Sequence, residues 1–491
     1  MTIQKIAFFY LVIPLFIFCA TWFNFYTCTI LLLSLFISCY FTKFSTELGD
    51  QPYILNKKTI LLAFAIAFIW CFWSGIGGYA YQSDDFPTRN AIYRDLIEYS
   101  WPVNYNYNKV YSLNYYIGFW LLPSLITKFI GLFINNQDLL FTIGLNILLL
   151  HSIIGVTIFF LLLISYIKPK NNKQILLVLL LAVFFSGIDV IGAIIYDWPI
   201  FDSQNFKMKT FDYKILHLEV YSGYGKVQYS SLTTLLFWVF NQSIPAWIIT
   251  LLVLKNKKPE NYGIFITLGL FYSPLPLFGI AIIMLTNCIL FLLNKELSLK
   301  YKLKNFISLS NIYIVPIFIV IATFISLNET GKHANLNFNV IIDDYLLFCL
   351  IEFGCYLFFI FFRYNKEPLF YVMTICLFTL CLFHIDMSMC DFQMRTTIPF
   401  LLLLMIYILQ YLLNKPHFLC KLMLYLLLII GACTPLIEFS RGIMQVSSSK
   451  SITHINDSWH SLGDKLPFFP YSNYLSRNKG NNKFYRLIAK H

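Results

Sequence analysis

Long apolar runs alternate with short polar segments along most of the chain. Roughly 20 helical residues are needed to cross the hydrocarbon core of a bilayer, which is about 30 Å thick. By that measure the pattern predicts an all-α, polytopic membrane bundle of about thirteen transmembrane helices. These lie near residues 5–20, 23–42, 59–79, 139–166, 174–196, 237–254, 261–273, 275–294, 305–326, 341–363, 368–384, 397–413 and 419–438.

Two other apolar stretches are not counted as spans. They are residues 113–133 and the first half of 228–248, and both contain proline, aromatic residues and polar groups. Such mixtures favour amphipathic helices that lie in the membrane interface. We therefore expect both to lie flat at the outer face.

Composition supports the membrane assignment. Of the 491 residues, 58% are hydrophobic and only 12% are charged, whereas soluble domains carry about a quarter charged residues. Most of the twelve cysteines lie inside apolar runs, so no disulfide framework is expected. The N-terminal run resembles a signal peptide, but a second apolar run follows at once, which favours a retained first span.

The net charge of +12 indicates topology rather than a nucleic-acid partner, because basic residues gather in cytoplasmic loops. With a cytoplasmic N-terminus and strict alternation, five basic segments fall on one side. They are residues 168–173, 255–261, 294–304, 363–368 and 414–421. The chain is thus expected to lie in a bacterial cytoplasmic (inner) membrane, among membrane lipids, with these segments inside.

The predicted organisation is one transmembrane domain, residues 1–439, and a short extracytoplasmic tail, residues 440–491. The inner loops are short. The longer polar segments all fall on the outer, extracytoplasmic or periplasmic side, at 79–138, 197–236 and 384–396. Function is therefore expected at the outer face.

An acidic pair, Asp84 and Asp85, opens the first outer loop just before Pro87 and a short amphipathic segment. One interpretation is structural: acids favour a helix N-terminus, and Asp85 can pair with Arg89 one turn later. The other is functional, because two adjacent carboxylates beside Arg89 and Arg94 can deprotonate a hydroxyl or hold a divalent cation. Both interpretations remain open.

The acidic pair and the segment "LNYYIGFWLLPSLITKFIG" after it resemble the GT-C superfamily of membrane glycosyltransferases, which includes protein mannosyltransferases and lipid A aminoarabinose transferases. The helix pair at 263–290, with prolines at its turn, is also similar to a hairpin common in that group. The resemblance covers residues 59–300 as a pattern of spans and loops. The acidic loop follows the third span here, whereas that group commonly places it after the first.

The resemblance implies a polyprenyl-phosphate sugar donor, a glycan or lipid acceptor, and chemistry at the extracytoplasmic face. One of Asp84 and Asp85 would be the catalytic base, and the other would orient substrate or bind a metal. Both metal-dependent and metal-independent members occur in the group, so Mg²⁺ or Mn²⁺ is a possible cofactor.

The loop at 384–396 offers partners for the leaving phosphate. It concentrates His384, Asp386, Asp391 and Arg395 at the mouth of two spans. The guanidinium of Arg395 can hold a phosphate through two hydrogen bonds. Arg395 can equally reach lipid headgroups or pair with Asp391 across one helical turn, and His384 taken alone is more often an interfacial residue than a ligand.

Further candidates lie near the same face. Asp189 is several residues inside a predicted span, where a carboxylate is costly and so a candidate for function. A sugar can stack on aromatic rings and bond to amides, which makes a substrate-binding set of four residues, although interfacial aromatic belts look alike. The set is Gln228, Trp238, Asn241 and Gln242. Glu438 and Arg441 are expected to form an i,i+3 ion pair.

Missing motifs narrow the function. There is no P-loop, no HExxH and no Cys/His cluster with metal-ligand spacing. The leading hypothesis is a GT-C-type glycosyltransferase of envelope glycan assembly. An O-antigen or capsule polymerase would rely on arginine-rich outer loops, and a lipid-linked glycan transporter or flippase would carry charges and helix breaks deep in several spans.

Overall fold

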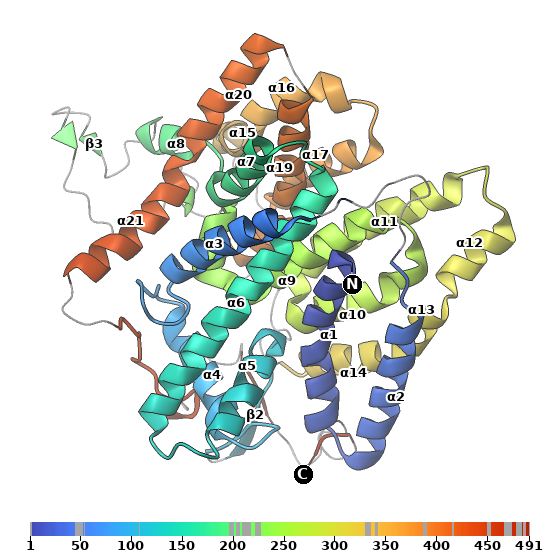
Figure 1. Ribbon diagram of the computed structural model, residues 1–491, viewed down its shortest axis with the longest axis vertical. Helices are drawn as coiled ribbons and strands as arrows, with labels where there is room; N and C mark the ends of the chain where they lie inside the picture. Colours follow the sequence, from blue (N-terminus) through green and yellow to red (C-terminus); the bar gives the residue numbers. More distant parts are fainter. Residues whose placement is uncertain are drawn as a thin grey trace.

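The computed structural model is a mainly helical bundle (Figure 1). All twelve cysteines are free thiols. The structure describes residues 2–44, 53, 55–107, 109–195, 201–202, 207–208, 218–220, 227–328, 335–338, 342–385, 390–414, 417–448, 453–465, 474–477, 484 and 488–490.

Helices account for most of the described chain. The first half contains α1 (Ile3–Thr21), α2 (Phe25–Phe41), α3 (Lys57–Trp73), α4 (Phe86–Glu98), α5 (Gly118–Ile130), α6 (Gln137–Ile167), α7 (Asn172–Phe184), α8 (Asp189–Ile195), η1 (Leu218–Val220) and α9 (Leu232–Lys255). The second half contains η2 (Pro259–Asn261), α10 (Tyr262–Tyr272), α11 (Pro274–Leu293), α12 (Leu299–Phe306), α13 (Leu309–Tyr313), α14 (Val315–Ser326), α15 (Ile342–Cys349), η4 (Leu350–Gly354), α16 (Cys355–Tyr364), α17 (Pro368–Leu380), α18 (Asp391–Thr396), α19 (Ile398–Leu413), α20 (Phe418–Gly431), α21 (Cys433–Ser448) and η5 (Gly463–Lys465).

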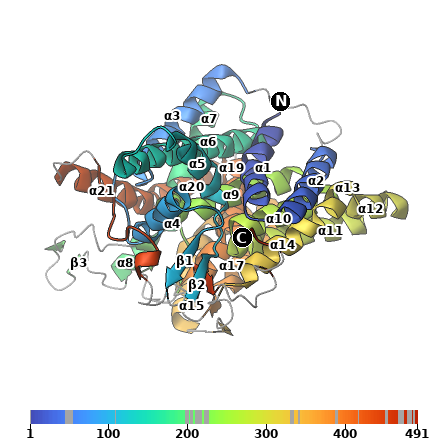
Figure 2. The ribbon, with the colours of Figure 1, turned by 90° about the horizontal axis from the view of Figure 1, so that it is seen from below.

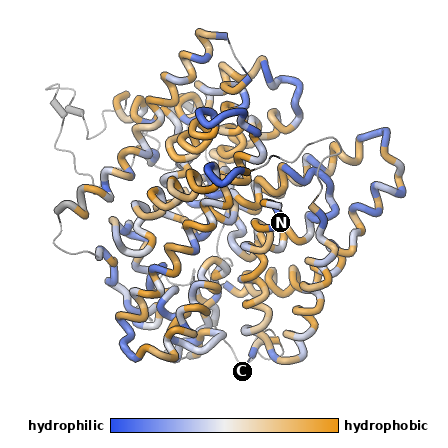
Figure 3. Tube along the Cα trace, viewed as in Figure 1, coloured by the Kyte–Doolittle hydropathy of each residue, from blue (hydrophilic) through white to orange (hydrophobic). Residues whose placement is uncertain are grey.

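The all-α prediction is confirmed, and helix occupies all thirteen of the predicted apolar segments. Within the described residues, seven helices are long and apolar enough to cross a membrane, or eight if the pair bent by 63° at Leu299–Ser326 counts as one span. Hydrophobic residues cover most helices, and hydrophilic ones gather in the connections (Figure 3). The chain is therefore built as a membrane protein.

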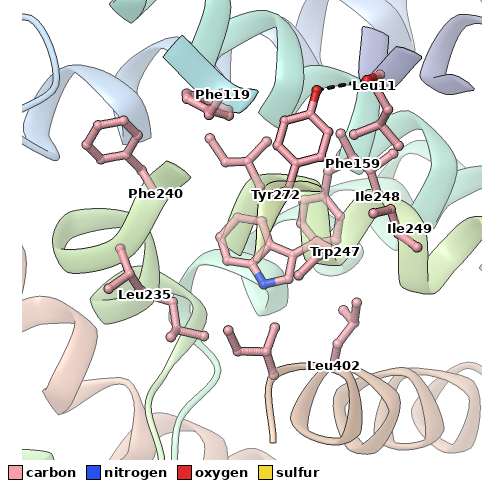
Figure 4. Close-up of a cluster of buried hydrophobic side chains, with 14 of the residues drawn as sticks. Leu11, Phe119, Phe159, Leu235, Phe240, Trp247, Ile248, Ile249, Tyr272 and Leu402 are labelled. Carbon is pink, nitrogen blue, oxygen red and sulfur yellow. Dashed lines mark hydrogen bonds between the residues drawn. The ribbon is translucent and has the colours of Figure 1, made fainter. Parts of the chain in front are cut away.

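The core forms around α6 and α9, which pack along each other near the middle of the bundle (Figure 1). Phe159 of α6 and Trp247 of α9 are fully buried, with ring centroids 5.0 Å apart. Figure 4 shows this cluster, where the Tyr272 hydroxyl donates to the Leu11 carbonyl at 2.9 Å and joins α10 to α1.

Helix α9 differs from the expectation for residues 228–248. The first half of that stretch is the start of a buried helix rather than a separate interfacial one. The helix bends at Val239, whose backbone angles are not helical. The Leu235 carbonyl accepts instead from the Ser243 hydroxyl at 3.2 Å, which satisfies a backbone group that the bend would leave free.

The predicted interfacial stretch 113–133 contains α5, a 13-residue helix. At 1.5 Å per residue it spans about 20 Å, which is too short to cross a bilayer alone. It packs beside α4 and α6 at the lower end of the molecule in Figure 1.

A small antiparallel sheet completes this end of the bundle. It joins β1 (Asn104–Tyr107), β2 (Lys109–Leu113) and β7 (Leu475–Arg477) in the order β1-β2-β7, with Leu113 opposite Leu475. Figure 2 shows β1 and β2 near α4 when this end is viewed from below. The remaining strands form two-stranded pairs, β3 (Phe201–Asp202) with β4 (Lys207–Met208) and β5 (Leu336–Phe338) with β6 (Phe383–Ile385).

The C-terminal chain returns to the same end. Helix α21 runs through the predicted domain boundary at 439/440, and residues 453–465 then lie against the segment that leads into α4. The backbone N–H of His454 donates to the Gly78 carbonyl at 2.6 Å, and that of Asn456 donates to the Gln82 side chain at 2.7 Å. The region of the acidic pair is thus covered by residues about 370 positions later in the chain.

Candidate functional site

Helix α4 presents the acidic pair. Pro87 lies in its first turn, where a missing N–H costs nothing, and Asp85 precedes the helix. The Asp85 carboxylate makes no hydrogen bond to the helix backbone, so it does not cap α4 in that way. It accepts instead from Arg89 Nη2 at 2.7 Å, the predicted i,i+4 pair, and its side chain remains 48% exposed.

Helix α18 presents the second ion pair. Asp391 stands in its first turn and Arg395 in its last, each at the end that the helix dipole favours. Arg395 Nη2 lies 2.8 Å from Asp391 Oδ1, again at i,i+4 spacing. Arg395 Nη1 also donates to the Tyr116 hydroxyl at 3.2 Å.

The Tyr116 hydroxyl links α18 to α9. It accepts from Gln242 Nε2 at 3.4 Å, and the Gln242 oxygen accepts from the Ser273 hydroxyl at 2.7 Å. Gln242 is buried immediately after the bend in α9. The bend therefore helps to place the amide that orients Tyr116 and, through it, Arg395.

The two ion pairs form one electrostatic cluster, which we call the ion-pair cluster: Asp85, Arg89, Tyr116, Asp391 and Arg395. Burial raises the pKa of Asp391; Arg395 and Arg89 act against this rise, and Asp85 adds to it. Burial alone would lower the pKa of Arg395, but Asp391, Tyr116 and Asp85 raise it overall. Segments about 300 residues apart thus meet in one charged site.

Two guanidinium nitrogens in the cluster have no protein partner among the described residues. They are Arg89 Nη1 and Arg395 Nε, and both are buried. Buried donors are nearly always satisfied by protein, water or ligand. Because both belong to cations, an anion is the ligand that suits them best.

Asp84 faces a different neighbour. It lines an open pocket of about 340 Å³ together with Tyr81, Gln82, His454, Ile455 and Asn456. One wall of this pocket is the segment before α4, and the other is the C-terminal chain. Asp84 therefore borders this pocket, while the neighbouring Asp85 is bonded to Arg89.

Arg94 binds the C-terminal chain. Its Nη2 contacts both oxygens of Asp457 at 2.8 and 2.9 Å, its Nη1 contacts the His460 ring, and its guanidinium lies 3.9 Å over the Phe141 ring. The adjacent Asp95 accepts from the Tyr105 hydroxyl at 2.6 Å and from the Leu462 N–H at 3.1 Å. These contacts hold the tail in place.

Two other predicted residues, Trp238 and Gln228, bond to groups outside the ion-pair cluster. Trp238 donates to Glu438 at 3.1 Å, and Glu438 forms the predicted pair with Arg441, which is buried. Gln228 donates to Ser230 at 2.9 Å. The Asn241 amide is buried without a partner among the described residues.

The predicted phosphate-binding loop at 384–396 lies partly outside the described residues. His384 lies in β6 opposite Asn337 of β5, but its side chain is not among those described, and Asp386 lies outside the described residues altogether.

Asp189 lies in a cluster of its own. It begins α8 and is buried with two other carboxyl groups, Glu219 of η1 and Glu352 of η4. Sequence reasoning did not single out either glutamate. Glu352 is the one acid within the apolar residues 345–362, and this unusual position could have identified it. Glu219 lies in a long polar loop, where an acidic residue is ordinary.

Tyr116, Asp457 and His460 were likewise not predicted as partners of the site arginines.

No group of three or more His, Cys, Asp and Glu side chains in the described part of the chain is arranged to hold a metal ion. Comparisons with family models, with curated proteins and with solved structures find no match for this chain. The assignment of function therefore depends on the site alone.

Proposed function

We propose that this protein is a GT-C-type membrane glycosyltransferase. It would transfer a sugar from a polyprenyl-phosphate donor to an envelope glycan or lipid acceptor. The single observation that supports this best is the meeting of Asp85 and Arg89 with Asp391 and Arg395 in one cluster. Sugar transfer from a lipid phosphate needs both a base for the acceptor and cations for the leaving group.

In this proposal the half-exposed carboxylate of Asp85 takes the proton from the acceptor hydroxyl. The hydroxyl oxygen forms a bond to the anomeric carbon as the bond from that carbon to the phosphate oxygen breaks. The departing polyprenyl phosphate keeps the electron pair. Arg89 and Arg395 stabilise its charge through the two nitrogens that lack a protein partner.

Asp84 has a separate role in this proposal. Its pocket of about 340 Å³ can admit the acceptor sugar beside the base. If a divalent cation takes part, Asp84 and Asp85 would hold it, with phosphate oxygens and water as the other ligands, and it would neutralise phosphate charge. Two neighbouring carboxylates, one of them already bonded to Arg89, fit a site that a substrate must complete.

We further propose that the site faces the extracytoplasmic side of a bacterial inner membrane. The five basic segments between helices support this orientation, because such loops are usually cytoplasmic. About thirteen spans would then include the shorter apolar helices Phe25–Phe41, Pro368–Leu380 and Ile398–Leu413, whereas we expect Gly118–Ile130 to lie at the interface.

The test is the surface glycan profile of the host strain carrying Asp84→Asn, Asp85→Asn or both. Asparagine keeps the size of the side chain but cannot act as a base. We expect loss of one glycan species in Asp85→Asn and a partial loss in Asp84→Asn, each with normal protein in the membrane.

Asp138→Asn is the matched control, because Asp138 is an exposed acid in the first turn of another helix, α6. Its profile should equal that of the wild type. An unchanged profile in the double variant would contradict the proposal and leave Asp85 with a structural role as the partner of Arg89.

A further inference from the structure

Three carboxyl side chains meet inside the bundle, away from the ion-pair cluster. Asp189, Glu219 and Glu352 are 1%, 1% and 4% exposed. They come from three segments, the start of α8, η1 and the π-helical turn η4, and both η1 and η4 contact α8. π-helical turns occur frequently at functional sites.

In two of the three carboxyl groups, one of the two oxygens accepts hydrogen bonds from neighbouring residues. Asp189 Oδ2 accepts from the Ser186 hydroxyl at 3.0 Å and from the Thr434 hydroxyl at 2.7 Å. Glu219 Oε1 accepts from the Ser231 N–H at 2.8 Å and from the Thr234 hydroxyl at 2.7 Å. These bonds fix the groups in place but leave their second oxygens free.

One oxygen of each carboxyl has no donor among the described residues. These oxygens are Asp189 Oδ1, Glu219 Oε2 and Glu352 Oε1. Asp189 and Glu352 are also close: a methyl group built on Gly187 would lie 3.2 Å from Asp189 Oδ1 and 2.7 Å from Glu352 Oε2. Ionised carboxylates only accept hydrogen bonds, so two that face each other need a proton between them.

No cation in the described part of the chain is paired with these three carboxyls. Among the described residues, the titratable groups that interact with it most strongly are neutral: Cys355 and Tyr356 of α16, Cys349 of α15, and Tyr229 ahead of α9. On α21, Arg441 is already paired with Glu438. On α20, Lys421 lies at the opposite end of the helix from Gly431, which contacts Ser186.

Three buried negative charges without a cation would be prohibitively unfavourable. Within the described part of the chain, protons or a bound metal are the groups left to neutralise them. The described carboxyls are not arranged as a metal-binding group, whereas the interaction between the Asp189 and Glu352 side chains is one that two carboxyls can make through a shared proton. Burial, followed by the charge of Asp189, raises the pKa of Glu219 to about 8.

We propose that Asp189, Glu219 and Glu352 form a proton-binding site inside the bundle. At least two of the three carboxyls carry a proton at neutral pH, and Asp189 and Glu352 share one. Raising the pH removes a proton and leaves the negative charges to repel one another across α8, η1 and η4. The proposal does not depend on the glycosyltransferase assignment.

The test is infrared spectroscopy of the purified full-length protein in lipid nanodiscs during a pH titration. A protonated carboxyl has a C=O stretching band that an ionised one lacks. We expect this band at pH 7 in the wild type and its decrease as the pH rises through about 8. It should weaken in Asp189→Asn, Glu219→Gln and Glu352→Gln, and remain unchanged in the exposed control Asp138→Asn.

Three results would overturn the proposal. One is the absence of a protonated-carboxyl band from the wild type at pH 7. This result uses the wild-type protein alone, so it does not depend on whether the variants fold. Another is a band that appears only after divalent metal is removed with EDTA, which would identify a metal site. A band that persists unaltered in all three folded variants would likewise place the protons elsewhere.

Discussion

Arg94 on α4 contacts both carboxylate oxygens of Asp457, which lies 363 residues further along the chain. The Arg94 side chain is 3% exposed, whereas that of Asp457 is 42% exposed. A buried guanidinium therefore depends on a carboxylate from the tail for its main neutralising contact. This pair, with Asp95 and Leu462 beside it, joins the C-terminal chain to the helix that carries the acidic pair.

Asp457→Asn should loosen the tail. The amide cannot neutralise Arg94, so we expect a loss of stability of about 1–3 kcal/mol and faster proteolysis after residue 453. Thermal unfolding and limited proteolysis of the purified protein measure both effects. Asp464→Asn is the control, because its exposed carboxylate accepts from the N–H of Ser461, three residues earlier in the same segment. Equal proteolysis of the two variants would show that the Arg94 contact does not hold the tail.

Tyr116→Phe should weaken sugar transfer without unfolding the protein. The change removes the hydroxyl that accepts from Arg395 and Gln242. Loss of one such hydrogen bond, about 1 kcal/mol, corresponds to roughly a fivefold decrease in kcat/KM. Transfer assays on membranes would measure it, with Tyr26→Phe as the control because Tyr26 is 80% exposed. Full activity would mean that Tyr116 does not orient Arg395.

Asp95 should give stability a specific pH dependence. Burial raises the pKa of Asp95 to about 6, against hydrogen bonds that lower it. Between about pH 4 and 6 the native state then binds more protons than the unfolded state, so the stability due to Asp95 falls as the pH rises. Thermal midpoints of the wild type should therefore drop across this range relative to Asp95→Asn. Parallel pH profiles for the two proteins would contradict this.

Gly75→Ala should disturb the loop that leads to the acidic pair. Gly75 has φ +84°, and an added Cβ would lie 2.4 Å from the backbone oxygen of Tyr81. The strained backbone alone costs about 1–2 kcal/mol, and the clash adds to it. Thermal unfolding is the measurement. Gly442→Ala is the control, since the nearest atom to its added Cβ is 3.3 Å away. An equal loss of stability in the two variants would show that the backbone conformation of Gly75 has no special role.

The helical class and the local ion pairs follow from the sequence alone. Apolar runs of helical length leave the backbone no other way to satisfy its hydrogen bonds in lipid, so helix appears in every predicted span. Asp85–Arg89, Asp391–Arg395 and Glu438–Arg441 were also readable in advance. Residues three or four apart on a helix face each other whatever the rest of the chain does.

Which of these charged residues come together in space follows from the tertiary structure. Three contacts join segments that are distant in the sequence. Asp85 interacts with Arg395, and Arg94 binds Asp457. Asp189 lies with Glu219 and Glu352. No periodicity encodes such pairings, because they follow from how the central helices α6 and α9 pack. The bend of α9 at Val239 was likewise hidden, since packing and the Ser243 hydroxyl compensate the broken backbone bond.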